Sequence, residues 1–183
     1  MKDHLAPGFL IAVPQLLDPN FRKSVVLLLQ QSEDGALGVV INHESPLLLK
    51  DLCDDHEISY AGDPGKRVRK GGPVQPEQGL VLYSDEHLDP EGRPVVAGLH
   101  VSASRATLAR LCNLARGRFH CYSGYAGWGP GQLEREIGDG SWILAPADPI
   151  LVLDREPDAI WLQSLGALGI DPAAIVPGSG GES

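Results

Sequence analysis

Short apolar runs separated by turn-forming residues recur along most of the 183-residue chain. Runs of this length, bounded by Gly, Pro, Asn or Asp, are typical of buried strands. The first two cover residues 8–13 and 25–29, and the sequence SEDG at 32–35 then carries the Asp-Gly signal of a hairpin turn. Residues 36–42 return as the partner strand. The N-terminal part of the chain therefore predicts an antiparallel sheet.

Later apolar runs predict further strands, with one short helix between the two groups. That helix is expected over 46–53, and residues 54–65 indicate a polar loop. The further strands are expected over 79–84, 94–102, 118–122, 141–144 and 150–153.

Three more segments are predicted as helices. The first begins after Ser104, a suitable N-cap, and ends before Gly117, which fits the position after a helix C-terminus. Its apolar stripe at helical spacing consists of Leu108, Leu111, Cys112 and Ala115. The other two helices are expected over 132–137 and 158–168.

The balance of these elements predicts the fold class. Strands outnumber helices and hairpin turns dominate, which favours an α+β fold over a doubly wound parallel sheet. The length and the absence of an internal repeat predict one domain over residues 1–176. The Gly- and Ser-rich end at 177–183 is expected to be a disordered tail.

Composition limits the classes of function. Hydrophobic residues make up 43% and charged residues 21% of the chain, as in a globular protein with a core. A formal net charge of −9 weighs against non-specific binding to nucleic acid or to an anionic membrane. The apolar runs are too short to span a bilayer, and the three cysteines contain no C-x-x-C pair. We therefore expect a soluble cytoplasmic protein with no membrane partner.

The sequence SGYAGWGPGQLEREI at 123–137 is the most unusual stretch. Glycine-rich turns that open a helix often bind anions, but this one lacks the lysine of a phosphate-binding loop and the G-x-G-x-x-G spacing of a dinucleotide site. Ser123 lacks the flanking glycines of a nucleophile elbow. Glu134 and Glu136 in the first helical turns would repel a phosphate.

Two interpretations of this stretch stay open. In the first, glycines allow a tight corner while Tyr125 and Trp128 fill the core. In the second, Tyr125, Trp128 and Gln132 form a binding surface. The exposure of the two aromatic side chains distinguishes these interpretations.

The strongest local charge lies in GKRVRKGG at 65–72, where four cations fall within five residues: Lys66, Arg67, Arg69 and Lys70. One interpretation is a solvated edge strand whose cations prevent pairing with other sheets. The other is a contact with phosphate or nucleic acid. Acidic and histidine residues at 54–57 and 85–87 lack the spacing of a zinc site. No metal site, cofactor or catalytic residue is predicted.

Four stretches together resemble the bacterial YqgE/AlgH family. They are FLIAVPQLLDPNFRKSVVLL at 9–28, DGALGVVIN at 34–42, GGPVQ at 71–75 and GYAGWGPGQLEREI at 124–137. The resemblance implies an α+β fold with a bifurcated, partly barrel-like antiparallel sheet flanked by helices. One branch of the family is labelled a transcriptional regulator of alginate synthesis, and no member is generally accepted as an enzyme with a known substrate.

Carried over position by position, the family motifs fall on Asp18, Pro19, Phe21, Ser24, Asn42, Gly71, Gly72, Pro73, Gly124, Tyr125, Gly127, Trp128, Gly131, Gln132 and Glu134. Where the family often has Leu-His-Ser, this chain has Leu82, Tyr83 and Ser84. A role for that histidine therefore does not transfer.

Three hypotheses follow, and the balance is against an enzyme. The first is a non-enzymatic binding or regulatory protein, with a protein or a small molecule as its partner. Its candidate binding surface is Asp18, Asn42, Gly72, Pro73, Tyr125, Trp128, Gln132 and Glu134. The second is a small-molecule or nucleotide-binding enzyme whose pocket gathers Asp18, Asn42, Gln132 and Glu134. The third is nucleic-acid binding through residues 66–70.

Overall fold

The computed structural model describes residues 5–87 and 89–175. Its strands are β1 (Gly8–Ala12), β2 (Val25–Ser32), β3 (Gly35–Val40), β4 (Glu44–Leu48), β5 (Arg67–Lys70), β6 (Val74–Ser84), β7 (Arg93–Val96), β8 (Leu99–Ser102), β9 (Phe119–Trp128) and β10 (Trp142–Ala145). Its helices are α1 (Leu49–Asp55), α2 (Arg105–Cys112), α3 (Gln132–Gly138), α4 (Pro149–Leu153) and α5 (Pro157–Ala167), with 3₁₀ turns at Asp85–His87 and Pro172–Ile175.

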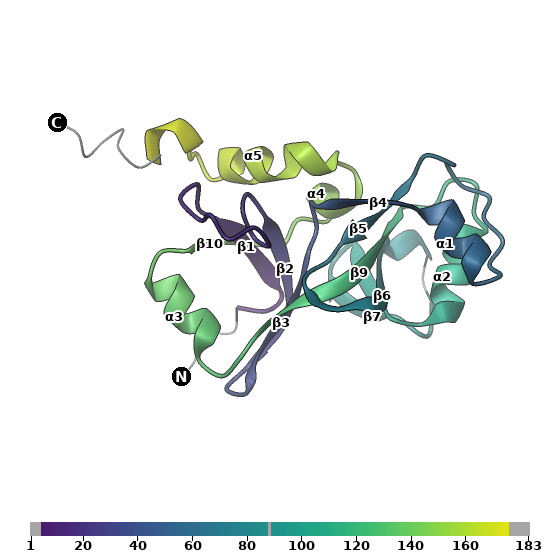
Figure 1. Ribbon diagram of the computed structural model, residues 1–183, viewed down its shortest axis with the longest axis horizontal. Coiled ribbons are helices and arrows are strands. Elements are labelled where there is room, and N and C mark those ends of the chain that lie inside the picture. The colour runs from purple at the N-terminus through teal and green to yellow at the C-terminus, as the bar shows by residue number, and fades with distance from the viewer. Residues whose placement is uncertain (1–4, 88, 176–183) are drawn as a thin grey trace.

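The strands form one curled sheet in the order β10-β1-β2-β3-β9-β6-β8-β7 (Figure 1). All pairs along this path are antiparallel. The long strand β9 joins the two halves, because its C-terminal end pairs with β3 and its N-terminal end with β6 and, in parallel, with β5. The predicted α+β class with a bifurcated antiparallel sheet is therefore confirmed.

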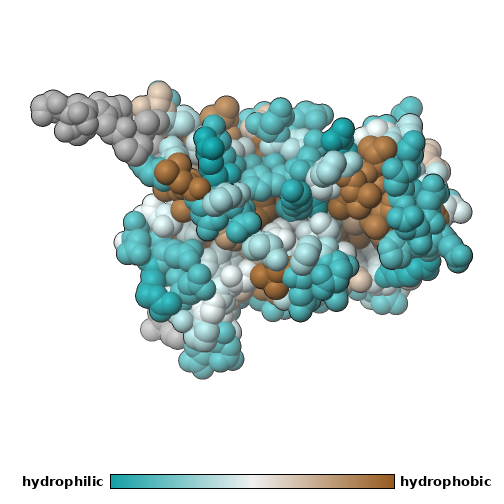
Figure 2. All heavy atoms as spheres, viewed as in Figure 1, coloured by the Kyte–Doolittle hydropathy of each residue, from teal (hydrophilic) through white to brown (hydrophobic). Residues whose placement is uncertain are grey.

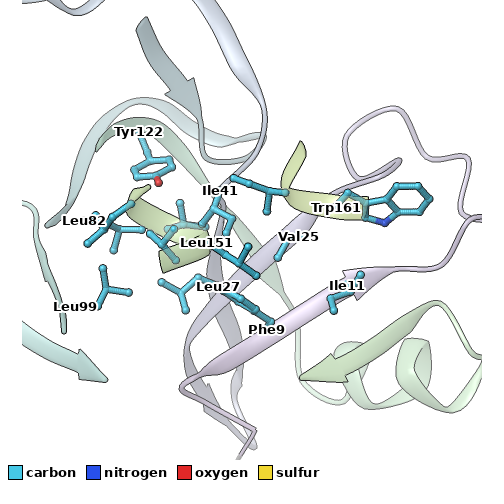
Figure 3. Close-up of a cluster of buried hydrophobic side chains, with 14 of the residues drawn as sticks. Phe9, Ile11, Val25, Leu27, Ile41, Leu82, Leu99, Tyr122, Leu151 and Trp161 are labelled. Atoms are coloured by element: carbon cyan, nitrogen blue, oxygen red, sulfur yellow. The ribbon is translucent and has the colours of Figure 1, made fainter. Parts of the chain in front are cut away.

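Successive side chains of a strand point to opposite faces of the sheet, so the half of the sheet that contains β10, β1, β2 and β3 has two apolar faces. Phe9 and Ile11 of β1 face a core that includes Leu151 of α4 and Trp161 of α5 (Figure 3). Leu10 and its neighbours face the opposite way, toward α3 and the indoles of Trp128 and Trp142. A third core lies between α1, α2 and the second half of the sheet. The face of the molecule in Figure 2 is mostly hydrophilic, with separate apolar patches.

Several sequence predictions are confirmed by the structure. The hairpin turn at 32–35 joins β2 to β3. The helix after Ser104 is α2, and the Ser104 side chain accepts a hydrogen bond from the Ala106 N–H, as an N-cap should. The helices predicted over 132–137 and 158–168 are α3 and α5.

Four local predictions are wrong. The single strand expected over 94–102 is two antiparallel strands, β7 and β8, which turn at Gly98 with φ +93°. Residues 150–153 form helix α4 rather than a strand, because Pro149 stands at its start and the Asp148 side chain caps the Ile150 N–H at 2.9 Å. The helix expected over 46–53 begins only at Leu49, after strand β4. Helix α2 ends at Cys112, so Gly117 does not terminate it.

No helix among residues 5–87 and 89–175 is long and apolar enough to cross a membrane. The tail predicted at 177–183 lies outside the described residues.

Candidate functional site

Three loops that are far apart in sequence meet around one polar hollow of about 410 Å³. They follow strand β1, strand β3 and strand β5. The lining residues are Pro19, Asn20, Val40, Asn42, His43, Glu44, Lys70 and Gly72. Three of the four stretches that carry the family resemblance therefore contribute to this hollow.

Asn42 holds two of these loops together. Its side-chain carbonyl accepts a hydrogen bond from the Val25 N–H at 2.9 Å, and its amide donates to the Lys23 carbonyl at 2.9 Å. Because Asn42 is only 9% exposed, these bonds satisfy polar groups that water reaches poorly. The Asn42 side chain thus builds the wall of the hollow and has little capacity left for a ligand.

The first loop is a compact turn fixed by Asp18. The Asp18 side chain accepts a hydrogen bond from the Asn20 N–H at 2.9 Å, and its carbonyl accepts from the N–H groups of Phe21 and Arg22. Ser24 is fully buried and donates its hydroxyl to the Phe21 carbonyl at 2.7 Å. Asp18 therefore acts on the backbone of the loop, which leaves the side chain of Asn20 exposed at the hollow.

The glycine pair after β5 is required by close packing against β9. The Gly71 N–H donates to the Ser123 carbonyl at 2.8 Å, and the Gly71 carbonyl accepts from the Val40 N–H at 2.8 Å. Gly72 has φ +152°, and a Cβ built on it would lie 2.2 Å from the carbonyl carbon of Tyr125. Only glycine fits there, since no real Cβ approaches backbone this closely.

The hollow offers groups of both charges and one neutral ring. Lys70 and Glu44 are exposed. Burial lowers the pKa of His43, and the nearby charge of Lys70 lowers it further. A hydrogen bond to the Arg22 main chain acts in the opposite direction and raises this pKa. The imidazole is therefore neutral at pH 7. The described lining thus places an ammonium, a carboxylate, an imidazole and an amide around one hollow, groups that bind polar ligands by hydrogen bonds and charge.

Trp128 belongs to the interior. It is 6% exposed, stacks on Phe21 with ring centroids 6.1 Å apart, and meets Trp142 edge to face. Its indole N–H donates to Glu136 at 3.0 Å. Tyr125 is half-buried, and its backbone lies in β9 opposite Val74 of β6. The stretch over 124–128 is therefore strand, and the core interpretation holds fully for Trp128 and partly for Tyr125.

The candidates on α3 have other partners. Gln132 accepts a hydrogen bond from the Gly129 N–H at 3.0 Å and donates to Glu136 at 2.9 Å. Glu134 accepts from the Gln31 amide at 2.8 Å and lines a different hollow. Of the four side chains expected in an enzyme pocket, only Asn42 lines the polar hollow. Pro73 follows Gly72 in the turn and is exposed.

The four cations of residues 66–70 differ in exposure: two are turned into the protein and two face solvent. Arg69 is 3% exposed and donates to the Ile41 carbonyl at 3.0 Å. Lys66 donates to the Phe119 carbonyl and lies 4.0 Å from the centroid of the Phe119 ring, and its burial lowers its pKa to about 8. Arg67 and Lys70 are exposed. The edge-strand interpretation is wrong, because β5 lies between β4 and β9.

Sequence reasoning missed Asn20, His43 and Glu44 as lining residues. Asn20 and His43 are adjacent to positions that it singled out, Pro19 and Asn42. That adjacency was the available signal, since residues next to a loop-fixing side chain share its loop.

Comparisons with known proteins agree with this architecture. A family model described as AlgH-like matches residues 9–173. A UPF0301 protein of Myxococcus xanthus is 44% identical over 178 residues, which cover 97% of this chain and 98% of the relative. A UPF0301 protein of Anaeromyxobacter sp. strain K is 39% identical over 186 residues, 97% of this chain and 94% of the relative.

Two solved structures are similar in fold. The solution structure of the AlgH protein from Pseudomonas aeruginosa matches with a TM-score of 0.72 and 31% identity, over 98% of this chain and 99% of that one. A crystal structure of a Corynebacterium diphtheriae protein matches with a TM-score of 0.76 and 22% identity, over 91% of this chain and 89% of that one.

Proposed function

Because this chain belongs to the AlgH-like family, we propose that it is a binding protein without a catalytic centre of its own. Its ligand site is the polar hollow between the loops that follow β1, β3 and β5. The supporting observation is the convergence of three distant sequence stretches on this one place. A regulatory role fits such a protein, since a bound ligand shifts whatever equilibrium it binds unequally.

The side chains at the mouth of the hollow indicate the chemistry of the ligand. Asn20 and Lys70 are exposed, and neither side chain makes a hydrogen bond or salt bridge within the described part of the chain. An ammonium beside an amide suits a carboxylate or phosphate group. Glu44 on the same rim suits an amine on the other end of the ligand. A small polar molecule with an acidic group is therefore the proposed ligand class.

Thermal unfolding with a ligand panel tests this proposal. Amino acids, phosphorylated metabolites, nucleotides, divalent metals and short oligonucleotides are each added to the protein and the Tm is recorded. A ligand at about 100 times its Kd stabilises the folded state by about 2.7 kcal/mol, which is a shift of several degrees. Lys70→Ala should abolish the shift, whereas Arg67→Ala, an exposed cation of the same strand outside the lining, should retain it.

An equal shift in both variants would place the ligand elsewhere, and no shift with any small molecule would remove the proposal. The oligonucleotide arm addresses nucleic-acid binding through residues 66–70. That alternative has weaker support, because Lys66 and Arg69 are turned to main-chain carbonyls inside the protein.

A further inference from the structure

Three strands have an edge without a partner among the described residues, and one of them differs from the other two. Strand β4 contains Pro46 and strand β7 contains Pro94. Proline cannot donate to a neighbouring strand and commonly protects exposed edges. Strand β10 has the sequence WILA, with neither a proline nor a charge, and ends the sheet beside β1. No described strand pairs with the outer edge of β10.

The register shows which peptide groups face outward from β10. The Val13 N–H donates to the Ser141 carbonyl at 3.1 Å, and Ile11 stands opposite Ile143. In an antiparallel pair, hydrogen-bonded positions alternate with positions whose peptide groups face away. The N–H and C=O groups of Trp142 and Leu144 therefore face the free edge.

Two apolar hollows flank this edge, one on each face of the sheet. A hollow of about 490 Å³ on the α3 side is lined by Leu5, Ile137 and Leu144. A hollow of about 370 Å³ on the α5 side is lined by Phe9, Ala145 and Leu168. Leu144 is 42% and Leu168 40% exposed. Figure 1 shows α3 and α5 on opposite sides of β1 and β10.

We propose that β10 is a docking edge for an extended peptide segment of another protein. The segment adds to the sheet as a further strand, through the outward peptide groups of Trp142 and Leu144. Successive side chains of a strand point to opposite faces, so alternate apolar residues of the peptide enter the two hollows. This surface lies apart from the polar hollow, because the two share no lining residue.

Charge identifies the partner further. Among the described residues, the charged ones that line the two hollows are all acidic: Glu33 and Glu134 on one side and Asp148 on the other. A partner with Lys or Arg flanking its apolar residues complements them. A second copy of this chain does not, since two-fold pairing of β10 would bring the same carboxylates together in molecules of net charge −9.

Amide NMR of the ¹⁵N-labelled protein with a synthetic peptide tests the proposal. The probe is acetyl-KVIVLK-amide, and the control is acetyl-EVIVLE-amide. Addition of the first should shift the amide signals of Trp142 and Leu144 and slow their hydrogen exchange. The acidic peptide should bind about tenfold more weakly, because its charges repel the rims. Equal binding of both peptides, or shifts elsewhere only, would overturn the proposal.

Variants of Leu144 and of the two glutamates distinguish the contribution of strand pairing to peptide binding from the contribution of charge. Leu144→Pro removes an outward N–H without touching a bond to β1, and should raise the Kd of the basic peptide about tenfold, whereas Leu144→Thr should raise it less. If Leu144→Pro does not fold, the double variant Glu33→Gln, Glu134→Gln decides, since it should abolish the preference for the basic peptide. Concentration-dependent shifts of Trp142 and Leu144 without any peptide would identify a second copy as the occupant and refute the proposal.

Discussion

Trp128 and Trp142 meet edge to face, with ring centroids 6.2 Å apart, and donate their indole N–H groups to one and the same oxygen of Glu136, at 3.0 and 2.9 Å. The other Glu136 oxygen accepts from Gln132 at 2.9 Å. Helix α3 is thus fixed against the end of β9 and the start of β10. Within the glycine-rich stretch over 124–137, Glu136 therefore has a structural role, because it ties helix α3 to the two indoles.

We expect Glu136→Ala to destabilise the fold by about 1–3 kcal/mol, because both indole N–H groups lose a charged acceptor. Glu136→Gln keeps one carbonyl oxygen and should cost less. Urea unfolding followed by tryptophan fluorescence measures both variants. If the two variants unfold at the same urea concentration as the natural chain, the shared oxygen has no role in stability.

Replacement of Gly72 by alanine should destabilise the protein by about 3–5 kcal/mol or prevent folding, because the new Cβ would meet the backbone of Tyr125 in a conformation unfavourable to side chains. Gly79→Ala is the matched control, since nothing lies within 4 Å of a Cβ there. Its stability should change by no more than about 0.5 kcal/mol. Urea midpoints compare the two, and similar losses would show that the turn tolerates a side chain.

Substitutions at Asn42 and Asn20 should distinguish a structural role from a role in ligand binding. Asn42→Ala leaves the buried Val25 N–H without its acceptor and should cost about 1–3 kcal/mol in the free energy of unfolding. Asn20→Ala should change stability by no more than about 0.5 kcal/mol, because its side chain is exposed. It should instead reduce the Tm shift produced by a ligand of the polar hollow. A large loss of stability in Asn20→Ala would contradict this division.

Acid should weaken the fold through its partly buried histidines. Burial and the nearby cations Arg69 and Lys66 hold the pKa of His120 well below its usual value, opposed by a hydrogen bond to the Leu153 main chain. In the unfolded chain His120 takes up a proton near pH 6.5, so between that pH and its lower folded pKa the unfolded state binds more protons. Its contribution to stability is complete above about pH 6.5 and falls below it, by up to about 1.4 kcal/mol per pH unit.

His43 and His87 also have lowered pKa values and add to this slope in the same direction. His120→Gln should therefore make the loss of stability between pH 6.5 and 5 shallower. Urea unfolding at several pH values measures the slope, and a slope that His120→Gln does not alter would contradict the assignment.

Sequence patterns predicted those parts of the fold in which local signals and packing agree. The hairpin at 32–35 and the Ser104 cap depend on neighbours in the chain, and both were predicted. The run at 150–153 has four apolar residues, which suit a buried strand or a buried helix equally, and packing of α4 decided it. The four cations of residues 66–70 favoured an exposed edge strand as one of two interpretations, yet Lys66 and Arg69 reach main-chain carbonyls of distant segments.

The candidate site was predicted only in part for the same reason. Motif positions identified the loops around the polar hollow, including Pro19, Asn42 and Gly72. They could not show that Trp128 faces the core while Asn20 faces solvent, because the direction of a side chain depends on contacts between segments far apart in sequence.

The pairing of β1 with β10 joins residues 9–12 to residues 142–145, and Trp161 of α5 donates its indole N–H to the Ala12 carbonyl at 2.7 Å. The loop-closure entropy of contacts so distant in sequence makes them slow to form. During synthesis, therefore, β1 leaves the ribosome long before its outer neighbour exists, and this half of the sheet can be completed only after the C-terminal helix has emerged. Chains halted before residue 142 would keep one side of β1 bare, and we expect them to be captured by chaperones or degraded.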